Sequence, residues 1–197
     1  LIISFSALVI DGYFQFFTGE NIFGFKFNGI RVSSFFGDEL IMGSYLSRLF
    51  PLLFALFLVK KKHKLEIYFI SILFIFVDVL IYISGERTAF FFLNLSTIFI
   101  IILIKEYQKF RLITFVIAII CIFILSNYST KLTDRMFLIP AESMGLIESS
   151  ESKKKYIFSE IHDGYIRTAL NMFNDKPILG HGPKMFRLKC SNPNYSV

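Results

Sequence analysis

Arginines and a glycine-rich turn are the groups in this sequence whose chemistry suits an anionic substrate. Arg87 stands in Ser84-Gly85-Glu86-Arg87-Thr88-Ala89, and Arg167 lies upstream of the turn Gly180-His181-Gly182-Pro183. A guanidinium keeps its proton and presents a planar fork of donors that matches two phosphate oxygens. Gly180 and Gly182 can adopt positive φ, so we expect backbone N–H groups of this turn to point outward and form a concave anion site.

Each of these features also has a plainer interpretation, which the sequence leaves open. Arg87 can be a helix-end arginine that extends to the membrane surface and pairs with Glu86. Arg167 can form a surface salt bridge with Asp163, four residues earlier on one helix. The turn at residues 180–183 can simply connect two elements.

His162 and His181 belong to the same C-terminal stretch as Arg167. A histidine titrates near neutral pH, so it suits a general base that removes the proton of a sugar hydroxyl. We rank both histidines below the arginines as candidates, because a cavity-lining or helix-surface position explains them equally simply.

A helix is expected to carry Arg167 and His162, because apolar residues recur around them at steps of three and four. These are Ile157, Phe158, Ile161, Tyr165, Ala169 and Phe173. The residue before a proline is disfavoured in the helical region, so Asp175-Lys176-Pro177 predicts the end of this helix. The pattern indicates a helix with one buried face, followed at once by the glycine-rich turn.

The composition is that of a multi-pass membrane protein. Of 197 residues 54% are hydrophobic, with 26 Phe, and the mean hydropathy is positive, which is far too apolar for a soluble domain. A net charge of +6 would otherwise suggest a nucleic-acid partner. Here the cations gather in short loops between apolar runs, so we expect membrane lipids and no nucleic acid as the surroundings.

The apolar runs predict an all-α, polytopic membrane helical bundle over residues 1–128, with spans at 41–59, 65–83, 88–104 and 112–128. Residues 1–10 are too few to cross ~30 Å of hydrocarbon. We therefore expect an internal fragment in which 1–10 is the remnant of a severed helix and 11–40 a polar connection. Residues 129–197 are expected to be a large, mainly helical and truncated loop on one side of the membrane.

The positions of the cations predict which loops face the cytoplasm. Seven Lys and Arg residues lie in the connections 60–64 and 105–111, against three in the other two connections, namely Lys26, Arg31 and Arg87. The positive-inside bias places the first two connections in the cytoplasm. Arg31, Arg87 and residues 129–197 then lie on the outer side, which in a bacterial inner membrane is the periplasm.

Two charged residues fall inside the predicted spans. At ~1.5 Å per residue, Arg48 and Asp78 lie at depths of about 10 and 8 Å from the outer side. Charges within a membrane are costly and tend to pair or to face a polar cavity. We expect Arg48 and Asp78 to form an ion pair between adjacent helices, or each to face a water-filled space separately.

Three stretches, in the same order, resemble the O-antigen ligase and O-antigen polymerase superfamily. The first runs from residues 10–15 through Gly19 and Arg31 to Gly37, and the second is residues 84–89. The third is an Arg-containing helix followed by residues 172–187, with Met-Phe, Asp-Lys-Pro, Ile-Leu-Gly-x-Gly-Pro and Phe-Arg in succession. Together the resemblance covers nearly the whole chain.

The resemblance implies an enzyme that transfers or polymerises glycan from an undecaprenyl-diphosphate-linked donor onto a sugar hydroxyl. The acceptor would be lipid A-core or another glycan, and no cofactor is implied. Arg87 and Arg167 would hold the departing pyrophosphate, with His162 and His181 as secondary candidates for the base. The donor site would be completed by the remaining candidates, Arg31, Gly180, Gly182 and Arg187. In the family the best-attested catalytic His lies in a motif further along the loop, which this chain does not reach.

Two rival functions stay open, and an inert membrane scaffold is a third alternative, against which the group of charges on one side counts. A protein O-oligosaccharyltransferase would use the same donor with a Ser or Thr acceptor. A polysaccharide flippase or other transporter would also need arginines in a polar cavity. No Asp-x-Asp occurs in the sequence, so we expect transfer without a metal ion.

Overall fold

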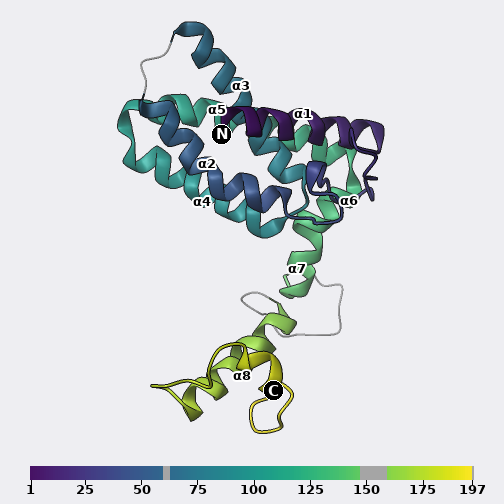
Figure 1. Cartoon of the computed structure of the whole chain (residues 1–197), viewed down its shortest axis with the longest axis vertical. Coiled ribbons are helices and arrows are strands. Elements are labelled where there is room, and N and C mark those ends of the chain that lie inside the picture. The colour runs from purple at the N-terminus through teal and green to yellow at the C-terminus, as the bar shows by residue number, and fades with distance from the viewer. Residues whose placement is uncertain (60–62, 147–158, 197) are drawn as a thin grey trace. The chain divides into compact units, whose positions relative to one another are not determined.

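The computed structural model describes residues 1–59, 63–146 and 159–196, and the regular elements in them are helices (Figure 1). The longer helices are α1 (Ile2–Thr18), α2 (Met42–Val59), α3 (Lys64–Ile83), α4 (Arg87–Leu103), α5 (Gln108–Tyr128) and α8 (Glu160–Asp175). The shorter ones are η1 (Ser34–Phe36), η2 (Lys105–Tyr107), α6 (Thr130–Thr133), η3 (Asp134–Leu138), α7 (Ile139–Ser143) and α9 (Met185–Lys189). The chain forms two compact units, Leu1–Met136 and Phe137–Val197.

Within the described residues, three helical segments are long and apolar enough to cross a membrane: Met42–Val59, Lys64–Ile83 and Lys105–Tyr128. α1 and α4 are apolar as well but have 17 residues each, or about 25 Å at ~1.5 Å per residue. In the first unit α2 lies against α4, and α3 against both α1 and α5 (Figure 1). The described part of the first unit is a helical bundle in which three segments are long and apolar enough to span a membrane.

The observed helices lie close to the apolar runs seen in the sequence, with one large departure. α2, α3 and α4 each differ by one residue from the segments 41–59, 65–83 and 88–104. The expectation of a polar connection beginning at residue 11 is wrong, because α1 continues to Thr18.

α1 continues because polar residues on its inner face find partners in the loop that follows. The Asp11 carboxylate accepts hydrogen bonds from the Ile22 N–H at 3.0 Å and from the Ser34 hydroxyl. The side-chain amide oxygen of Gln15 accepts from the N–H groups of Ser33 at 3.0 Å and Ser34 at 2.7 Å. Asp11, Gln15 and Ser34 are fully buried, so these bonds fix the loop against the helix.

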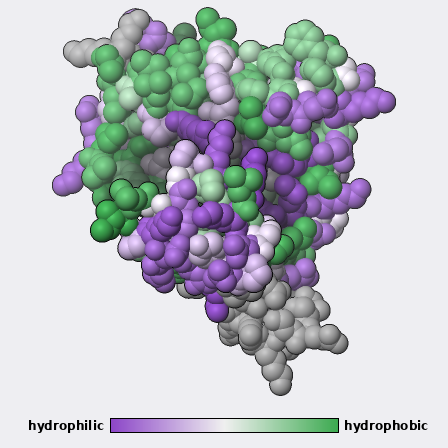
Figure 2. All heavy atoms as spheres, turned by 60° about the horizontal axis from the view of Figure 1, so that its bottom comes forward, coloured by the Kyte–Doolittle hydropathy of each residue, from purple (hydrophilic) through white to green (hydrophobic). Residues whose placement is uncertain are grey.

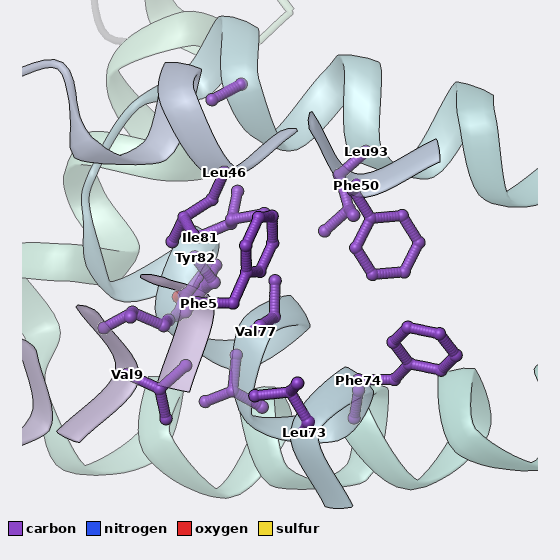
Figure 3. Close-up of a cluster of buried hydrophobic side chains, with 14 of the residues drawn as sticks. Phe5, Val9, Leu46, Phe50, Leu73, Phe74, Val77, Ile81, Tyr82 and Leu93 are labelled. Carbon is purple, nitrogen blue, oxygen red and sulfur yellow. The ribbon is translucent and has the colours of Figure 1, made fainter. Parts of the chain in front are cut away.

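Phenylalanine fills much of the core of the first unit. The rings of Phe54 and Phe74 stack with their centroids 5.6 Å apart, and those of Phe57 and Phe110 at 4.9 Å. Figure 3 shows Phe5 and Val9 of α1 pointing toward side chains of α2 and α3, including Leu46 and Tyr82. The core therefore joins all five long helices of the first unit, α1 to α5.

Many large apolar side chains of the long helices are exposed, such as Phe91 at 61% and Phe123 at 69%. Figure 2 shows the resulting hydrophobic areas in green, with hydrophilic side chains in separate purple areas. A contiguous apolar exterior on helices of this length is what a lipid-facing surface requires.

The expected pairing of Arg48 with Asp78 is wrong, because Asp78 pairs with Arg111. The Asp78 carboxylate accepts hydrogen bonds from Arg111 Nη1 at 2.8 Å and Nη2 at 3.1 Å, and both side chains are buried. Arg111 Nη2 also donates to the Thr97 hydroxyl at 2.6 Å, and its guanidinium lies 4.6 Å from the centroid of the Phe50 ring. Arg48 is exposed.

Arg111 is thus not a loop cation. α5 begins at Gln108 rather than at residue 112, and it can include Arg111 because Asp78 neutralises that charge inside the bundle. Without Arg111, the two lysine-rich connections 60–64 and 105–111 contain six Lys residues instead of seven Lys and Arg residues. Lys60, Lys61 and Lys62 lie outside the described residues, and the sidedness of the membrane stays a prediction.

In the second unit, α8 ends at Asp175, two residues before Pro177, as expected. Ile157 and Phe158 lie outside the described residues. Ile161, Tyr165 and Phe173 are 66%, 57% and 58% exposed, so the expected burial of this face is wrong for the described part of the chain. The buried side chains of α8 are instead those of Thr168 and Met172.

Candidate functional site

The turn at Gly85 joins α3 to α4 and lies at the centre of the candidate site. Its φ is +66°, which favours glycine, and its N–H donates a hydrogen bond to the Tyr82 carbonyl at 3.0 Å. A Cβ atom at this position would lie 2.9 Å from the Ile30 carbonyl oxygen and 3.0 Å from Cγ of Arg31. The glycine therefore lets the outer loop pack directly on the turn.

Glu86 is held by the first residues of α2. Its Oε1 accepts a hydrogen bond from the Gly43 N–H at 2.7 Å, and its Oε2 accepts from the Ser44 N–H at 3.1 Å and the Ser44 hydroxyl at 2.6 Å. A carboxylate at a helix N-terminus is stabilised by these donors and by the helix dipole. The alternative in which Glu86 is the ion-pair partner of Arg87 is wrong for this reason.

Arg87 begins α4 and is exposed. Within the described residues its guanidinium forms no hydrogen bond or salt bridge. Its place at the N-terminal end of α4, next to the Gly85 turn, leaves its donors available to a ligand.

Arg31 reaches the same turn from the loop between α1 and α2. Its Nη2 donates a hydrogen bond to the Leu40 carbonyl and lies 3.9 Å from Glu86 Oε1. Its Nε is buried and forms no hydrogen bond with the described residues. The buried contacts of Asp11 and Gln15 fix the loop that carries it.

Arg135 is a third cation at the turn. Its Nε donates a hydrogen bond to the Gly85 carbonyl at 2.9 Å. Partial burial lowers the pKa of Arg135, and the positive charges of Arg31 and Arg87 lower it further, against a smaller opposite effect of Glu86. We call Arg31, Arg87 and Arg135 the Gly85 cluster.

The Gly85 cluster can bind an anion with several oxygens. Arg31 lies 3.9 Å from the Glu86 carboxylate, Arg135 is hydrogen-bonded to the Gly85 carbonyl, and Arg87 follows in sequence, while both Glu86 oxygens already accept hydrogen bonds from α2. Positive charge at the cluster is therefore in excess, and a phosphate or diphosphate would offset it through charge-assisted hydrogen bonds.

The other predicted arginine, Arg167, lies in the second unit. Its Nε is 2.6 Å from Asp163 Oδ2, and the side chain is 60% exposed. The plainer interpretation, a surface salt bridge on one helix, is confirmed. Such an exposed pair contributes ~0.3–0.5 kcal/mol.

The two histidines also have structural contacts. His162 lies in the first turn of α8, where its Nδ1 is 2.6 Å from the Ser159 hydroxyl. The His181 ring is 5% exposed: its Nδ1 is 3.1 Å from Lys189 Nζ, and its Nε2 is 3.0 Å from the Met172 carbonyl oxygen. Because an ammonium group only donates, Nδ1 of His181 is the acceptor and is occupied.

The glycine-rich turn at residues 180–183 has the expected positive φ angles, but the N–H of Gly180 has an internal partner. Gly180 and Gly182 have φ of +63° and +92°. The Gly180 N–H donates to the Lys176 carbonyl at 3.0 Å, so the expectation that it points outward to an anion is wrong. Arg187 lies on the short helix α9 and is exposed.

In the described part of the chain, His, Cys, Asp and Glu side chains nowhere form a group of three that could hold a metal ion. The expected metal-independent reaction stays a prediction. Of the predicted site residues, Arg31 packs on the Gly85 turn and Arg87 follows that turn as the first residue of α4, whereas Arg167, His162, His181 and Arg187 belong to the second unit.

No family model matches this chain, and no significant match occurs among the curated proteins or the solved structures. The resemblance of its short motifs to O-antigen ligases and polymerases stays a prediction, and the Gly85 cluster is the observation from which a function can be argued.

Proposed function

We propose that this chain is part of a bacterial inner-membrane glycan transferase of the O-antigen ligase and O-antigen polymerase kind. The donor is an undecaprenyl-diphosphate-linked glycan, and the acceptor is a sugar hydroxyl. One observation carries the proposal: Arg31 packs against Gly85, two residues before Arg87, while Glu86 between them is hydrogen-bonded to the first residues of α2. The same turn contains the Ser-Gly-x-Arg-Thr residues on which the resemblance rests.

The proposed reaction needs arginines with available hydrogen-bond donors at the Gly85 turn. The acceptor oxygen forms a bond to the anomeric carbon, the bond from that carbon to the diphosphate oxygen breaks, and the hydroxyl proton passes to a base. Negative charge grows on the departing lipid diphosphate, so guanidinium groups placed at its oxygens stabilise the transition state more than the ground state. Arg87 is suited to this role because its donors are not used within the described residues.

Neither histidine of the second unit is assigned as the base. His181 uses Nδ1 toward Lys189, and His162 lies against Ser159. We expect divalent-cation chelation of the purified protein to leave transfer unchanged, because the arginines supply the positive charge. Loss of transfer on chelation, with recovery on adding Mg²⁺ or Mn²⁺, would refute the metal-independent reaction.

Disruption of the gene in its host tests the proposal through the lipopolysaccharide pattern on a gel. Loss of O-antigen from lipid A-core, with polymer accumulating on the lipid carrier, indicates a ligase. A band with one repeat and no ladder indicates a polymerase. An unchanged ladder contradicts both and favours a protein oligosaccharyltransferase or a different exported glycan.

Complementation with Arg87→Ala then tests the site. We expect transfer to be lost while the amount of protein in the membrane stays normal, because Arg87 has no structural partner among the described residues to lose. The matched control is Arg48→Ala, which removes an exposed arginine of α2 outside the cluster. Full activity of Arg87→Ala at normal membrane level would refute the assigned role.

A further inference from the structure

The segment that follows α5 is fixed on the first unit by packing. Leu132 and Met136 are 3% and 6% exposed and belong to the hydrophobic core. The Thr133 hydroxyl between them donates a hydrogen bond to the Ser126 carbonyl at 2.9 Å. Arg135 is therefore held in place by its neighbours and not only by its own contacts.

Arg135 and Arg31 pass close to the same α-carbon. A Cβ atom at Gly85 would lie 3.3 Å from Cδ of Arg135 and 3.0 Å from Cγ of Arg31. Arg135 uses Nε for the Gly85 carbonyl, and within the described residues no hydrogen bond uses its two Nη groups. These are the two donors that a planar fork presents to a phosphate.

Among the described residues, no salt bridge neutralises Arg135. The Glu86 carboxylate is the acidic group that acts on Arg135, and its oxygens are bonded to Gly43 and Ser44 of α2. Cations that packing holds close together, and that keep unused hydrogen-bond donors, form a preorganised anion site. The free energy needed to place these like charges close together is supplied when the protein folds and not when the anion binds.

We propose that Arg135 is the third arm of a diphosphate site, in which Arg31, Arg87 and Arg135 bind the two neighbouring phosphates of a lipid diphosphate. The proposal rests on the proposed function for its ligand, and it assigns to that site a residue outside every motif of the resemblance. The site lies at the ends of α3 and α4, where a lipid headgroup would stand while its chain remains among the apolar helices.

Binding to the purified full chain in phosphatidylcholine nanodiscs tests the proposal without any transfer reaction. The probes are farnesyl diphosphate, which carries the group on a lipid, and inorganic pyrophosphate, which carries it in water. The variants are Arg135→Gln and Arg135→Lys, with Lys26→Gln as a matched control that removes an exposed cation of the outer loop. The readout is the dissociation constant, with the unfolding midpoint without ligand as a check on folding.

We expect Arg135→Gln to weaken binding of farnesyl diphosphate about tenfold or more, and Lys26→Gln to change it less than twofold. Arg135→Lys keeps the charge without the fork, so we expect an intermediate loss. If Arg135→Gln does not fold, Arg135→Lys decides, and unchanged binding in it overturns the proposal. Equal affinities of Arg135→Gln and Lys26→Gln overturn it as well.

The two probes separate the sources of the anion. Weaker binding of both probes in Arg135→Gln supports a site for the diphosphate group itself, and weaker binding of farnesyl diphosphate alone supports a site that reads the group only at the membrane. An effect on pyrophosphate alone overturns the lipid assignment. The wild-type protein could bind farnesyl diphosphate, and Arg135→Gln could bind it more weakly, although the protein has no transfer activity. That result would refute the proposed function and leave this proposal standing.

Discussion

Replacement of Asp78 and Arg111, singly and together, would measure what the buried ion pair contributes. Asp78→Leu leaves a guanidinium without its carboxylate inside the bundle, and Arg111→Met leaves the carboxylate alone. The double variant removes both charges and puts apolar side chains of similar length in their place. The pair is well suited to this cycle because both side chains are buried and joined by two hydrogen bonds of 2.8 and 3.1 Å.

The structure sets the expected magnitude. Breaking a buried pair by removing one partner costs about 3–5 kcal/mol, whereas replacing both partners by apolar residues is often close to neutral. Arg111→Met also removes the bond to the Thr97 hydroxyl and the contact with the Phe50 ring, so it should lie at the upper end. We therefore expect a coupling energy of about 3 kcal/mol or more between the two sites.

Unfolding by sodium dodecyl sulfate in mixed micelles, followed by far-UV circular dichroism, would supply the free energies; the chain has no Trp for fluorescence. Arg48→Met is the matched control, since Arg48 is exposed and we expect a change within about 0.5 kcal/mol. A double variant as unstable as the sum of the single ones would refute the pairing. So would an Arg48→Met variant as unstable as Arg111→Met.

Three further predictions concern the outer turn and the second unit. In Gly43→Ala the new Cβ would overlap the Ser84 hydroxyl and lie 3.0 Å from Glu86 Oε1, so we expect a loss of about 1–3 kcal/mol in the same unfolding assay; wild-type stability would contradict these contacts. Gly85→Ala adds a side chain at φ +66° and 2.9 Å from a backbone carbonyl, so we expect weaker binding of farnesyl diphosphate than in wild type, and unchanged binding would contradict the packing. The hydrogen bond to the Asp175 carboxylate raises the pKa of Tyr195. This bond stabilises the neutral phenol below the ordinary tyrosine pKa of about 10 and is lost as pH rises through the raised value. The absorbance titration of Tyr195 is obtained as the difference between a protein and its Tyr195→Phe variant. Its midpoint should lie at lower pH in Asp175→Asn than in wild type, and an unchanged midpoint would refute the bond.

The sequence was sufficient where structure depends on local pattern. Hydropathy over 18 residues or more located α2 and α3 to within one residue of their bounds. Pro177 predicted the end of α8, and the break between the apolar runs 65–83 and 88–104 predicted a connection next to Arg87. These features depend on neighbours along the chain, which the sequence displays directly.

The sequence was insufficient where a residue depends on a distant partner. Arg111 follows Lys105 and Lys109, so it resembles a loop cation until Asp78, on another helix, is known to face it. Arg135 gave no signal, because its position at the turn results from the packing of Leu132 and Met136. The spacing of these two apolar residues, four apart, was the one sequence feature that could have indicated a buried segment there.

The order in which Asp78 and Arg111 are synthesised has a consequence for biogenesis. The carboxylate leaves the ribosome 33 residues before the guanidinium that neutralises it. An Asp at the centre of an inserting helix disfavours insertion by about 2.5–3.5 kcal/mol; Asp78 lies five residues before the end of α3 at Ile83, so its cost is smaller, and the apolar side chains of α3 oppose it. The translocon must therefore keep α3 out of the lipid until Arg111 has been synthesised, or release α3, α4 and α5 into the lipid as one group. Truncation of a nascent chain between α4 and α5 should leave Asp78 exposed to the bilayer. The truncated chain should then be a substrate for membrane quality-control proteases.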